Sequence, residues 1–180
     1  DRAYSSDANV IVRSATTVIE TFLGKGMTPF IKHIPGHGRA TCDSHIDLPC
    51  VEASRDVLAQ TDFVPCREIS QKYGDKVWGM TAHILYKDID KDFPSTLSQK
   101  VLQGAIRDEI GFNGFLVSDD VDMGALKQYG SAVDRSKMAL EAGCDCVLYC
   151  AGIYEDMEQL AGGMPNLTDE ALERLQRSGR

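Results

Sequence analysis

The stretch GFLVSDD at residues 114–120 points to the fold class, because a near-continuous apolar run stops abruptly at two carboxylates. Three further runs share this short apolar character and are also predicted to be strands: residues 30–34, 77–84 and 146–150. Strands that are buried on both faces of a parallel sheet have such near-continuous runs, whereas half-exposed strands alternate. We therefore predict a parallel sheet in which residues 114–118 form one strand.

Helical segments are predicted between these strands. The first is indicated by apolar residues that recur on one helical face, followed by glycines that stop the helix: Ile11, Ala15, Val18, Phe22, Gly24 and Gly26. Thr96 and Gln99 resemble a capping box for a second helix that ends at Gly111. A third helix is expected over residues 131–142, and a broken helical tail over residues 157–175. The alternation predicts an α/β fold with right-handed crossovers, about half of a (β/α)8 barrel of about 250 residues.

Length and charge exclude several kinds of partner. The 180 residues suffice for one domain with a sizeable core, and they contain no run of about 18 apolar residues that could span a bilayer. Nineteen Lys and Arg oppose 27 Asp and Glu, which gives a net charge of −8. Such a surface repels nucleic acid and anionic lipid. We expect a soluble globular protein that binds neither nucleic acid nor a membrane.

The six cysteines include no CxxC pair, and three of them fall in the apolar stretch GCDCVLYC at residues 143–150. Cysteine in such a stretch is typical of a small core residue rather than a metal ligand. Reduced thiols are usual in the cytosol, where disulfides are rare. We therefore expect structural thiols and a cytoplasmic location.

The segment KHIPGHGRATCDSHIDLP at residues 32–49 carries the densest set of reactive side chains. Its proline and glycines allow a sharp turn close to a ligand, although a Gly-His-Gly string alone is typical of a surface turn. Asp43 and His45 lie two residues apart, so in an extended loop they point the same way. A carboxylate in that position orients the imidazole and favours its protonated form.

Two other segments place polar side chains at the ends of predicted strands. Asp119 and Asp120 follow Ser118 at the end of an apolar run, where paired carboxylates would meet at the mouth of a barrel. Asp120 has the alternative role of capping the following helix. His83 ends another apolar run, as either a structural histidine with satisfied hydrogen bonds or a direct substrate contact. We expect Lys32, His33, His83 and Asp119 at one end of the sheet.

Together, the KH-PGHG, DSH and SDD strings resemble glycoside hydrolase family 3, and within it the bacterial β-N-acetylglucosaminidases of peptidoglycan recycling. The resemblance extends from Asp1 to about Gly152. It implies that residues 1–180 are the C-terminal part of a barrel domain whose first strands are absent here. An unpaired first strand should then leave an exposed apolar edge.

Carried over to this sequence, the resemblance implies a catalytic role for three residues. Asp119 corresponds to the nucleophile, His45 to the acid/base and Asp43 to the partner that orients His45. Sugar-binding roles are implied for three further residues: Arg2, Lys32 and His33. In the implied reaction, the histidine donates a proton and later accepts one, as a group with an ordinary pKa of roughly 6.5 can.

The implied function is a retaining exo-glycosidase that releases terminal β-linked N-acetylglucosamine from muropeptides or chitooligosaccharides, without metal or cofactor. Another family 3 activity, such as β-glucosidase, is an alternative. A second alternative is a metal-dependent barrel hydrolase that uses His33, His37, His45 and Asp43 as ligands, although their spacing matches no firm metal pattern. A non-catalytic sugar-binding domain is a third, against which the joint presence of Asp119 and the Asp43–His45 pair argues.

Overall fold

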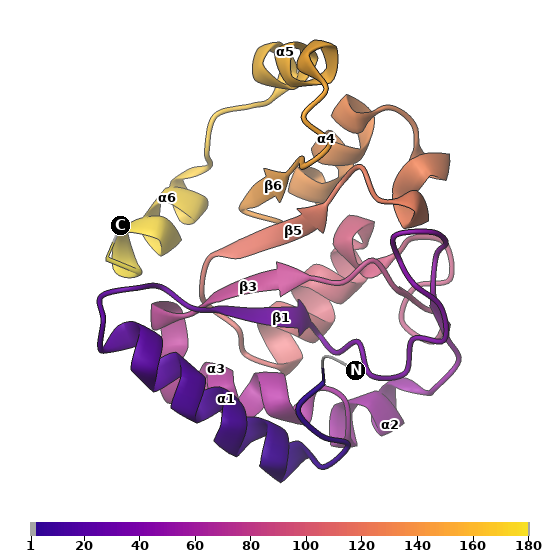
Figure 1. The fold of residues 1–180 in the computed structure, drawn as a ribbon. Helices are drawn as coiled ribbons and strands as arrows, with labels where there is room; N and C mark the ends of the chain where they lie inside the picture. Colours follow the sequence, from indigo (N-terminus) through magenta and orange to yellow (C-terminus); the bar gives the residue numbers. More distant parts are fainter. Residues whose placement is uncertain (1–2, 180) are drawn as a thin grey trace.

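Four parallel strands form the main sheet of the computed structural model, which describes residues 3–179 (Figure 1). In spatial order they are β1 (Phe30–Ile34), β3 (Trp78–Thr81), β5 (Leu116–Asp120) and β6 (Cys146–Leu148). Two short strands, β2 (Cys50–Val51) and β4 (Leu85–Tyr86), pair in parallel as a second sheet. The predicted α/β fold with a parallel sheet is confirmed.

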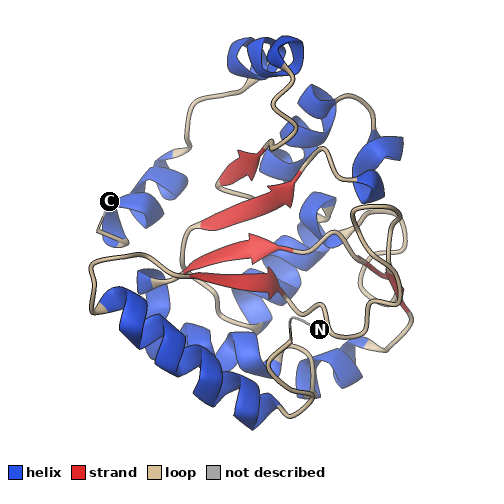
Figure 2. Cartoon of the chain, viewed as in Figure 1, coloured by secondary structure: helices blue, strands red, loops and turns tan. Residues whose placement is uncertain are grey.

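Helices connect the successive strands, as Figure 2 shows. The α-helices are α1 (Ala8–Leu23), α2 (Arg55–Gln60), α3 (Val64–Tyr73), α4 (Ala132–Ala142), α5 (Tyr154–Gly163) and α6 (Asp169–Arg177). The remaining helical segments are the 3-10 helices η1 (Gly74–Lys76), η2 (Ser95–Leu97) and η4 (Gly124–Tyr129), and the π-helix η3 (Lys100–Glu109). Helices α1 and α3 lie beside β1, whereas α6 lies near the ends at which the strands begin (Figure 1). Within residues 3–179, no helix is both long and apolar enough to cross a membrane.

Most of the predicted boundaries agree with the structure, but the capping box does not. Thr96 is fully buried inside η2, and the side chain of Gln99 makes no capping hydrogen bond. Ser98 takes that role instead, since its hydroxyl accepts a hydrogen bond from the Val101 N–H at 3.2 Å. The Thr96 hydroxyl is directed into a buried polar network, which local sequence could not indicate. Helix α4, by contrast, begins with a capping box between Ser131 and Asp134.

Two predicted strands end earlier than expected. The run at residues 77–84 leaves the main sheet after Thr81, and the chain pairs again at β4, where the Leu85 N–H donates to the Pro49 carbonyl. The last run ends at Leu148 rather than Cys150. Cys150 is exposed and Cys146 half-buried, so the prediction of core cysteines is right only for Cys144 in that stretch.

The core lies on both faces of the sheet. The larger cluster fills the space between the sheet and the helices, with Leu116, Leu102 and Ile106 among its fully buried members. A smaller cluster on the other face packs Phe115 and Val117 against α6. Trp78 joins that face, with its ring centroid 4.7 Å from that of Phe115 and 5.2 Å from that of Phe30.

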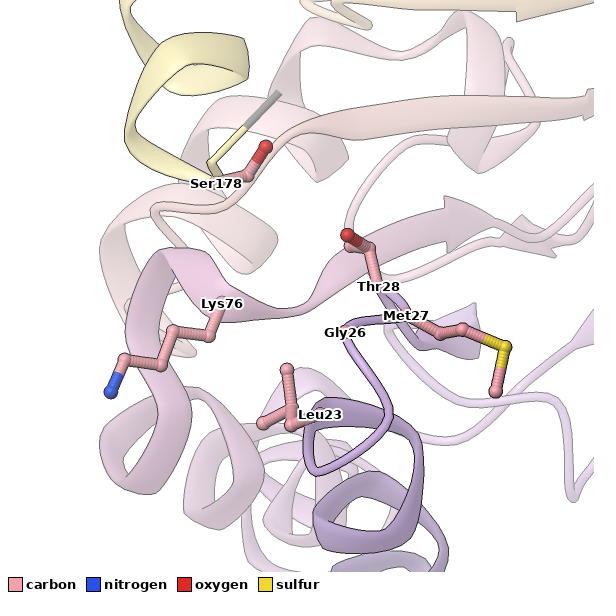
Figure 3. Close-up of a pocket in the computed structure, with 6 residues that line it drawn as sticks. All are labelled: Leu23, Gly26, Met27, Thr28, Lys76 and Ser178. Carbon is pink, nitrogen blue, oxygen red and sulfur yellow. The ribbon is translucent and has the colours of Figure 1, made fainter.

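Among residues 3–179, β1 pairs only with β3, so the sheet has an open edge at β1. Phe30, on this strand, is 43% exposed, and Phe22 and Met27 before it are also exposed. The expected exposed apolar edge is therefore present. A small groove lies at this end of the sheet, lined by Leu23, Gly26, Met27, Thr28, Lys76 and Ser178 (Figure 3). Five of these residues precede β1 or β3 and Ser178 follows α6, so the groove lies at the amino end of the sheet, opposite the strand ends that carry Asp119.

The amino end of the sheet is held by a buried ionic network. The Asp145 carboxylate accepts hydrogen bonds from Arg107 Nη2 at 3.0 Å, Arg174 Nη1 at 2.6 Å and the Leu116 N–H at 2.8 Å. Arg107 also donates to the carbonyls of Phe112 and Gly114. Because these groups come from β5, η3, α6 and their connections, the network fixes α6 across the start of the strands.

Candidate active site

The chemically reactive residues gather at the carboxyl end of the main sheet. His33 lies in β1, His83 follows β3 by two residues, and Asp119 lies in β5. These three strands are neighbours and run in parallel, so their carboxyl ends share one edge. Lys32 lies exposed on β1 beside His33. The expectation that these four residues lie at one end of the sheet is confirmed by the strand order and direction.

Both strands that carry the site are irregular at this end. The register between β1 and β3 shifts between Lys32 and Ile34, and that between β5 and β6 shifts between Val117 and Asp120. Bulges of this kind redirect a side chain without ending the strand. The skipped residues include His33 and Asp119, so the irregularities occur at the two side chains that meet.

His33 and Asp119 form an ion-pair contact across the sheet. The distance from His33 Nε2 to Asp119 Oδ2 is 3.1 Å, and the two side chains are 21% and 19% exposed. Burial raises the pKa of Asp119, but the hydrogen bonds from His33 and from the Asp120 N–H, together with the charge of His33, lower it to about 2. Asp119 is therefore an ionised carboxylate that solvent can still reach, as a nucleophile requires.

Asp43 and His45 form a second pair, on a loop after β1. Asp43 Oδ1 lies 2.6 Å from His45 Nδ1 and also accepts the His45 N–H at 3.0 Å. The predicted pairing is present, but the predicted extended conformation is wrong: residues 44–46 form a turn in which Ile46 and Asp47 donate to the Asp43 carbonyl. The turn keeps the two side chains together. With Nδ1 engaged, Nε2 is the ring nitrogen available for proton transfer.

The loop that carries this dyad is anchored by the segment after β5. The Gly124 N–H donates to the His45 carbonyl at 3.1 Å, and the Ala125 N–H donates to the Ser44 carbonyl at 3.2 Å. A Cβ at Gly124 would lie 2.5 Å from the Ile46 carbonyl oxygen and 2.6 Å from that of His45. Only glycine permits this approach. The sequence prediction missed this anchor, although the glycine in DMGAL was visible.

The PGHG turn is fixed at its base. Tyr86 donates a short hydrogen bond to the Gly36 carbonyl, and Arg39 Nε donates to Asp62 Oδ2 at 2.7 Å. Gly36 has a φ of 155°, and a Cβ there would lie 2.9 Å from the Asp62 carbonyl oxygen. The close approach explains the glycine. The turn is thus tied to β4 and to the connection between α2 and α3.

His37, in the same turn, lies among the reactive groups. Its ring centroid is 5.2 Å from that of His33. Burial lowers the pKa of His37, and the neighbouring His33 lowers it further, whereas Asp119 and Asp43 raise it. His37 therefore senses both carboxylates of the site, one on β5 and one on the dyad loop. The sequence prediction gave it a role only as a ligand in the metal-dependent alternative.

The side chains of His83 and Asp120 are hydrogen-bonded to other parts of the protein. His83 is 1% exposed, and both ring nitrogens are engaged, which favours the structural alternative over direct substrate contact. Asp120 Oδ1 accepts the N–H groups of Asp122 at 3.0 Å and Cys150 at 3.1 Å. The alternative that Asp120 caps the next helix is wrong, because Met123 is the N-cap residue of η4. Asp120 instead joins the turn after β5 to the one after β6.

Arg2 and the four proposed metal ligands are the other residues to which the sequence gave a role. Arg2, assigned to sugar binding, lies outside the described residues. Of the four ligands of the metal-dependent alternative, His45 is paired with Asp43, whereas His33 lies beside His37 and contacts Asp119. Among residues 3–179, no three His, Cys, Asp or Glu side chains are grouped as metal ligands. The geometry therefore gives that alternative no support.

A parallel sheet with helices outside it and a cluster of histidines and carboxylates at its carboxyl edge defines an α/β protein of the barrel class. Residues 1–178 match the model of the Glycosyl hydrolase family 3 N terminal domain. The chain belongs to glycosyl hydrolase family 3, and its sheet is part of a TIM-type barrel.

Named relatives agree with this assignment. The chain is 38% identical over 151 residues to a beta-hexosaminidase of Alkalilimnicola ehrlichii, covering 83% of this chain and 42% of the relative. It is 34% identical over 177 residues to a beta-hexosaminidase of Methylobacillus flagellatus, covering 98% and 50%. The chain thus spans about half the length of the curated relatives it matches.

Solved structures are similar over nearly the whole chain. A family 3 β-N-acetylglucosaminidase from Paenibacillus sp. str. FPU-7 has a TM-score of 0.88 at 30% identity, with 98% of this chain and 35% of that chain covered. NagZ from Neisseria gonorrhoeae in complex with N-trifluoroacetyl-D-glucosamine has a TM-score of 0.84 at 30% identity, with 98% and 50% covered.

Proposed function

We propose that this chain supplies the nucleophile and the acid/base of a retaining β-N-acetylglucosaminidase. One observation carries the proposal. Asp119, an ionised and solvent-accessible carboxylate, lies at the carboxyl end of β5, and the segment after β5 holds the loop of the His45–Asp43 dyad through the amides of residues 124 and 125. Retaining glycosidases need a nucleophile and an acid/base group, usually two carboxylates. Here the dyad takes the place of the second carboxylate.

In the first step, Asp119 attacks the anomeric carbon while His45 Nε2 donates its proton to the leaving oxygen. A covalent glycosyl-enzyme forms, and the aglycone leaves as an alcohol. In the second step, neutral His45 takes a proton from water, which displaces Asp119 and releases the sugar with retained configuration. Asp43 holds Nδ1 throughout, so it fixes the ring and stabilises the imidazolium that is present before the first step and formed again in the second.

Sugar binding falls to residues beside the nucleophile. His33 reaches Asp119 from β1, and Lys32 lies exposed next to it, so both can donate to hydroxyl groups of a ring seated on Asp119. Arg2 takes a similar role on the grounds of the family resemblance alone. Hydrogen bonds of this kind hold the anomeric carbon in line for attack.

The substrate is a terminal β-linked N-acetylglucosamine on a muropeptide or chitooligosaccharide. Support comes from the relatives, which are named as beta-hexosaminidases and β-N-acetylglucosaminidases, one of them with an N-trifluoroacetyl-D-glucosamine ligand. A cytoplasmic role in peptidoglycan recycling fits the six free cysteines and the acidic charge. Residues 1–180 are the C-terminal part of the barrel domain, which agrees with the unpaired edge of β1.

A trapped intermediate tests the nucleophile. The full-length protein is treated with a fluorinated N-acetylglucosaminyl sugar that slows the second step, and a digest is analysed by mass spectrometry. We expect the adduct on Asp119, none in Asp119→Asn, and an unchanged adduct in Asp56→Asn, a surface control on α2. An adduct on Asp120, or an oxazoline with no protein adduct, would contradict the mechanism. Faster hydrolysis of β-glucosides than of β-N-acetylglucosaminides would favour the β-glucosidase alternative.

The acid/base role is tested through the leaving group. His45→Ala should slow turnover of natural substrates by about 10²–10⁴-fold, the usual contribution of general acid–base catalysis. Aryl glycosides should suffer much less, because their leaving groups depart without a proton. Equal losses on both substrate types would show that His45 is not the acid.

A further inference from the structure

A buried polar network lies directly beneath Asp119, and the reaction scheme makes no use of it. Thr81 Oγ1 and Thr96 Oγ1 are 2.7 Å apart, and Thr96 Oγ1 lies 2.8 Å from His83 Nδ1. His83 Nε2 lies 2.9 Å from the Asp120 carbonyl oxygen, and the Asp119 N–H donates to Thr81 Oγ1 at 3.4 Å. The three side chains are 0–1% exposed. The network therefore begins and ends on the backbone of residues 119 and 120.

Counting hydrogens restricts the state of His83. A carbonyl oxygen only accepts, so Nε2 must carry a hydrogen to bond with Asp120. The tautomer with hydrogen on Nδ1 alone would set two lone pairs against each other and is excluded. The choice left is between the neutral ring with hydrogen on Nε2 and the imidazolium.

Burial decides between these two states. It lowers the pKa of His83 and outweighs the raising effects of the Asp120 carbonyl and of the Asp119 and Asp120 carboxylates, while His33 lowers the pKa further. A neutral ring has a bare Nδ1, which must accept the Thr96 hydroxyl hydrogen. The Ala82 carbonyl oxygen, 3.0 Å from Thr96 Oγ1, is a second acceptor for that hydrogen, but it also accepts the Ser95 hydroxyl, whereas Nδ1 of a neutral His83 has Thr96 as its donor.

The remaining hydrogens then have one arrangement. Thr96 has given its hydrogen to His83, so Thr81 must donate to Thr96, and Thr81 Oγ1 is free to accept the Asp119 N–H. Every donor is used once, and every bond points the same way. We infer that His83, neutral with its hydrogen on Nε2, completes a one-way chain of hydrogen bonds through Thr96 and Thr81 that positions the backbone on both sides of the nucleophile.

The uncharged state matters for the nucleophile. The Asp119 carboxylate already has one histidine partner, His33. A permanent positive charge on a second neighbouring group would stabilise the carboxylate further and make it less reactive. A neutral chain fixes the backbone without adding that charge. His83, Thr96 and Thr81 are thus positioning residues, and this role rests on the proposed function of Asp119 as the nucleophile.

Nitrogen NMR of histidine-labelled protein tests the state of His83 without any assay of turnover. The His83 signals are assigned in the full-length protein as those that persist in His33→Gln, His37→Gln and His45→Gln and are lost in His83→Gln. We expect a protonated Nε2 and a bare Nδ1, unchanged between about pH 8 and pH 6, although an ordinary histidine titrates in that range. An imidazolium at neutral pH, or hydrogen on Nδ1 alone, would overturn the inference.

A pair of variants tests the positioning role. Thr96→Val removes, at nearly constant shape, the hydroxyl that orients Thr81, so the bond from the Asp119 N–H to Thr81 should be lost. Hydrogen exchange of the Asp119 amide should then be about five- to tenfold faster relative to that of the Leu116 amide, as expected for the loss of about one hydrogen bond. Thr96→Ser should restore protection, and Thr21→Val, exposed on α1, should have no effect. Equal effects of Thr96→Ser and Thr96→Val would overturn the role, and if Thr96→Val does not fold, the tautomer in the unsubstituted protein decides. Absence of turnover in every preparation would contradict the proposed function but leave the tautomer result unaffected.

Discussion

The two ends of the main sheet each hold a carboxylate, and they hold it in different ways. Asp145, at the amino end, is 3% exposed and lies between Arg107 and Arg174. Asp119, at the carboxyl end, is 19% exposed and has one histidine, His33, as its side-chain partner. The first carboxylate is enclosed by cations and cannot reach a ligand. The second is kept ionised but open, so one sheet provides stability at one end and reactivity at the other.

The same substitution at each end should separate these roles, beginning with the larger effect. Asp119→Asn in the full-length protein should lower turnover of an aryl β-N-acetylglucosaminide on the order of 10⁴-fold or more, as losses of catalytic residues do elsewhere. The free energy of unfolding should fall by roughly 2 kcal/mol at most, because the ionised carboxylate stabilises the fold above its unfolded pKa. Turnover close to that of Asp56→Asn would mean that the carboxyl end is not the reactive one.

Asp145→Asn should produce the reverse pattern. It leaves Arg107, 8% exposed, without its counter-charge. Removing one partner of a buried ion pair lowers the free energy of unfolding by about 3–5 kcal/mol. We expect a fall of that size in the free energy of unfolding by urea denaturation, with kcat nearly unchanged while the protein is folded. Lys72→Gln, which removes an exposed ion pair with Glu20, is the matched control and should cost less than about 1 kcal/mol. A large loss of kcat at unchanged stability would show that the two ends are not independent.

Gly124→Ala tests how the dyad loop is held at the carboxyl end. The new Cβ would meet the carbonyl oxygens of Ile46 and His45, so the loop that carries His45 must shift. A misplacement of about 1 Å can cost up to about 10²-fold, and we expect a loss of kcat of about 10- to 100-fold on substrates with poor leaving groups. Gly104→Ala is the control, because a Cβ there meets nothing within 4 Å. If both variants retain full activity, the amides of residues 124 and 125 do not set the position of His45.

The smallest expected effect concerns the charge state of Asp119. His33→Ala removes the hydrogen bond and charge that lower the pKa of Asp119 to about 2, so this pKa should rise toward its ordinary range. The ionised carboxylate stabilises the fold above its unfolded pKa, and this stabilisation is lost as the pH falls through the folded pKa. In His33→Ala the loss should therefore occur at a higher pH. A carbon NMR titration of the Asp119 carboxyl measures the change. His45→Ala should leave this pKa in place, and a shift of equal size there would contradict the role of His33.

Much of the fold follows from the sequence, because short apolar runs that end in polar residues are a local property. The four main strands and the gathering of Lys32, His33 and Asp119 at one edge were predicted in this way. The Asp43–His45 contact was also predicted from the spacing, although the loop forms a turn and is not extended as predicted. The family resemblance added roles for these residues that no spacing could provide.

Other features depend on residues that are distant in sequence, so only the tertiary structure decides them. Thr96 looked like a helix cap but is turned inward, because His83 and Thr81 offer its hydroxyl partners 13 and 15 residues away. The two short strands β2 and β4 arise from pairing across 35 residues, with little apolar pattern of their own. The contact between His33 and Asp119 needs two register shifts in neighbouring strands. The sequence by itself determined which residues could react and at which end of the sheet. Packing between distant segments determined which of them meet, because hydrogen bonds and ion pairs form only where the folded backbone brings their atoms within about 3 Å.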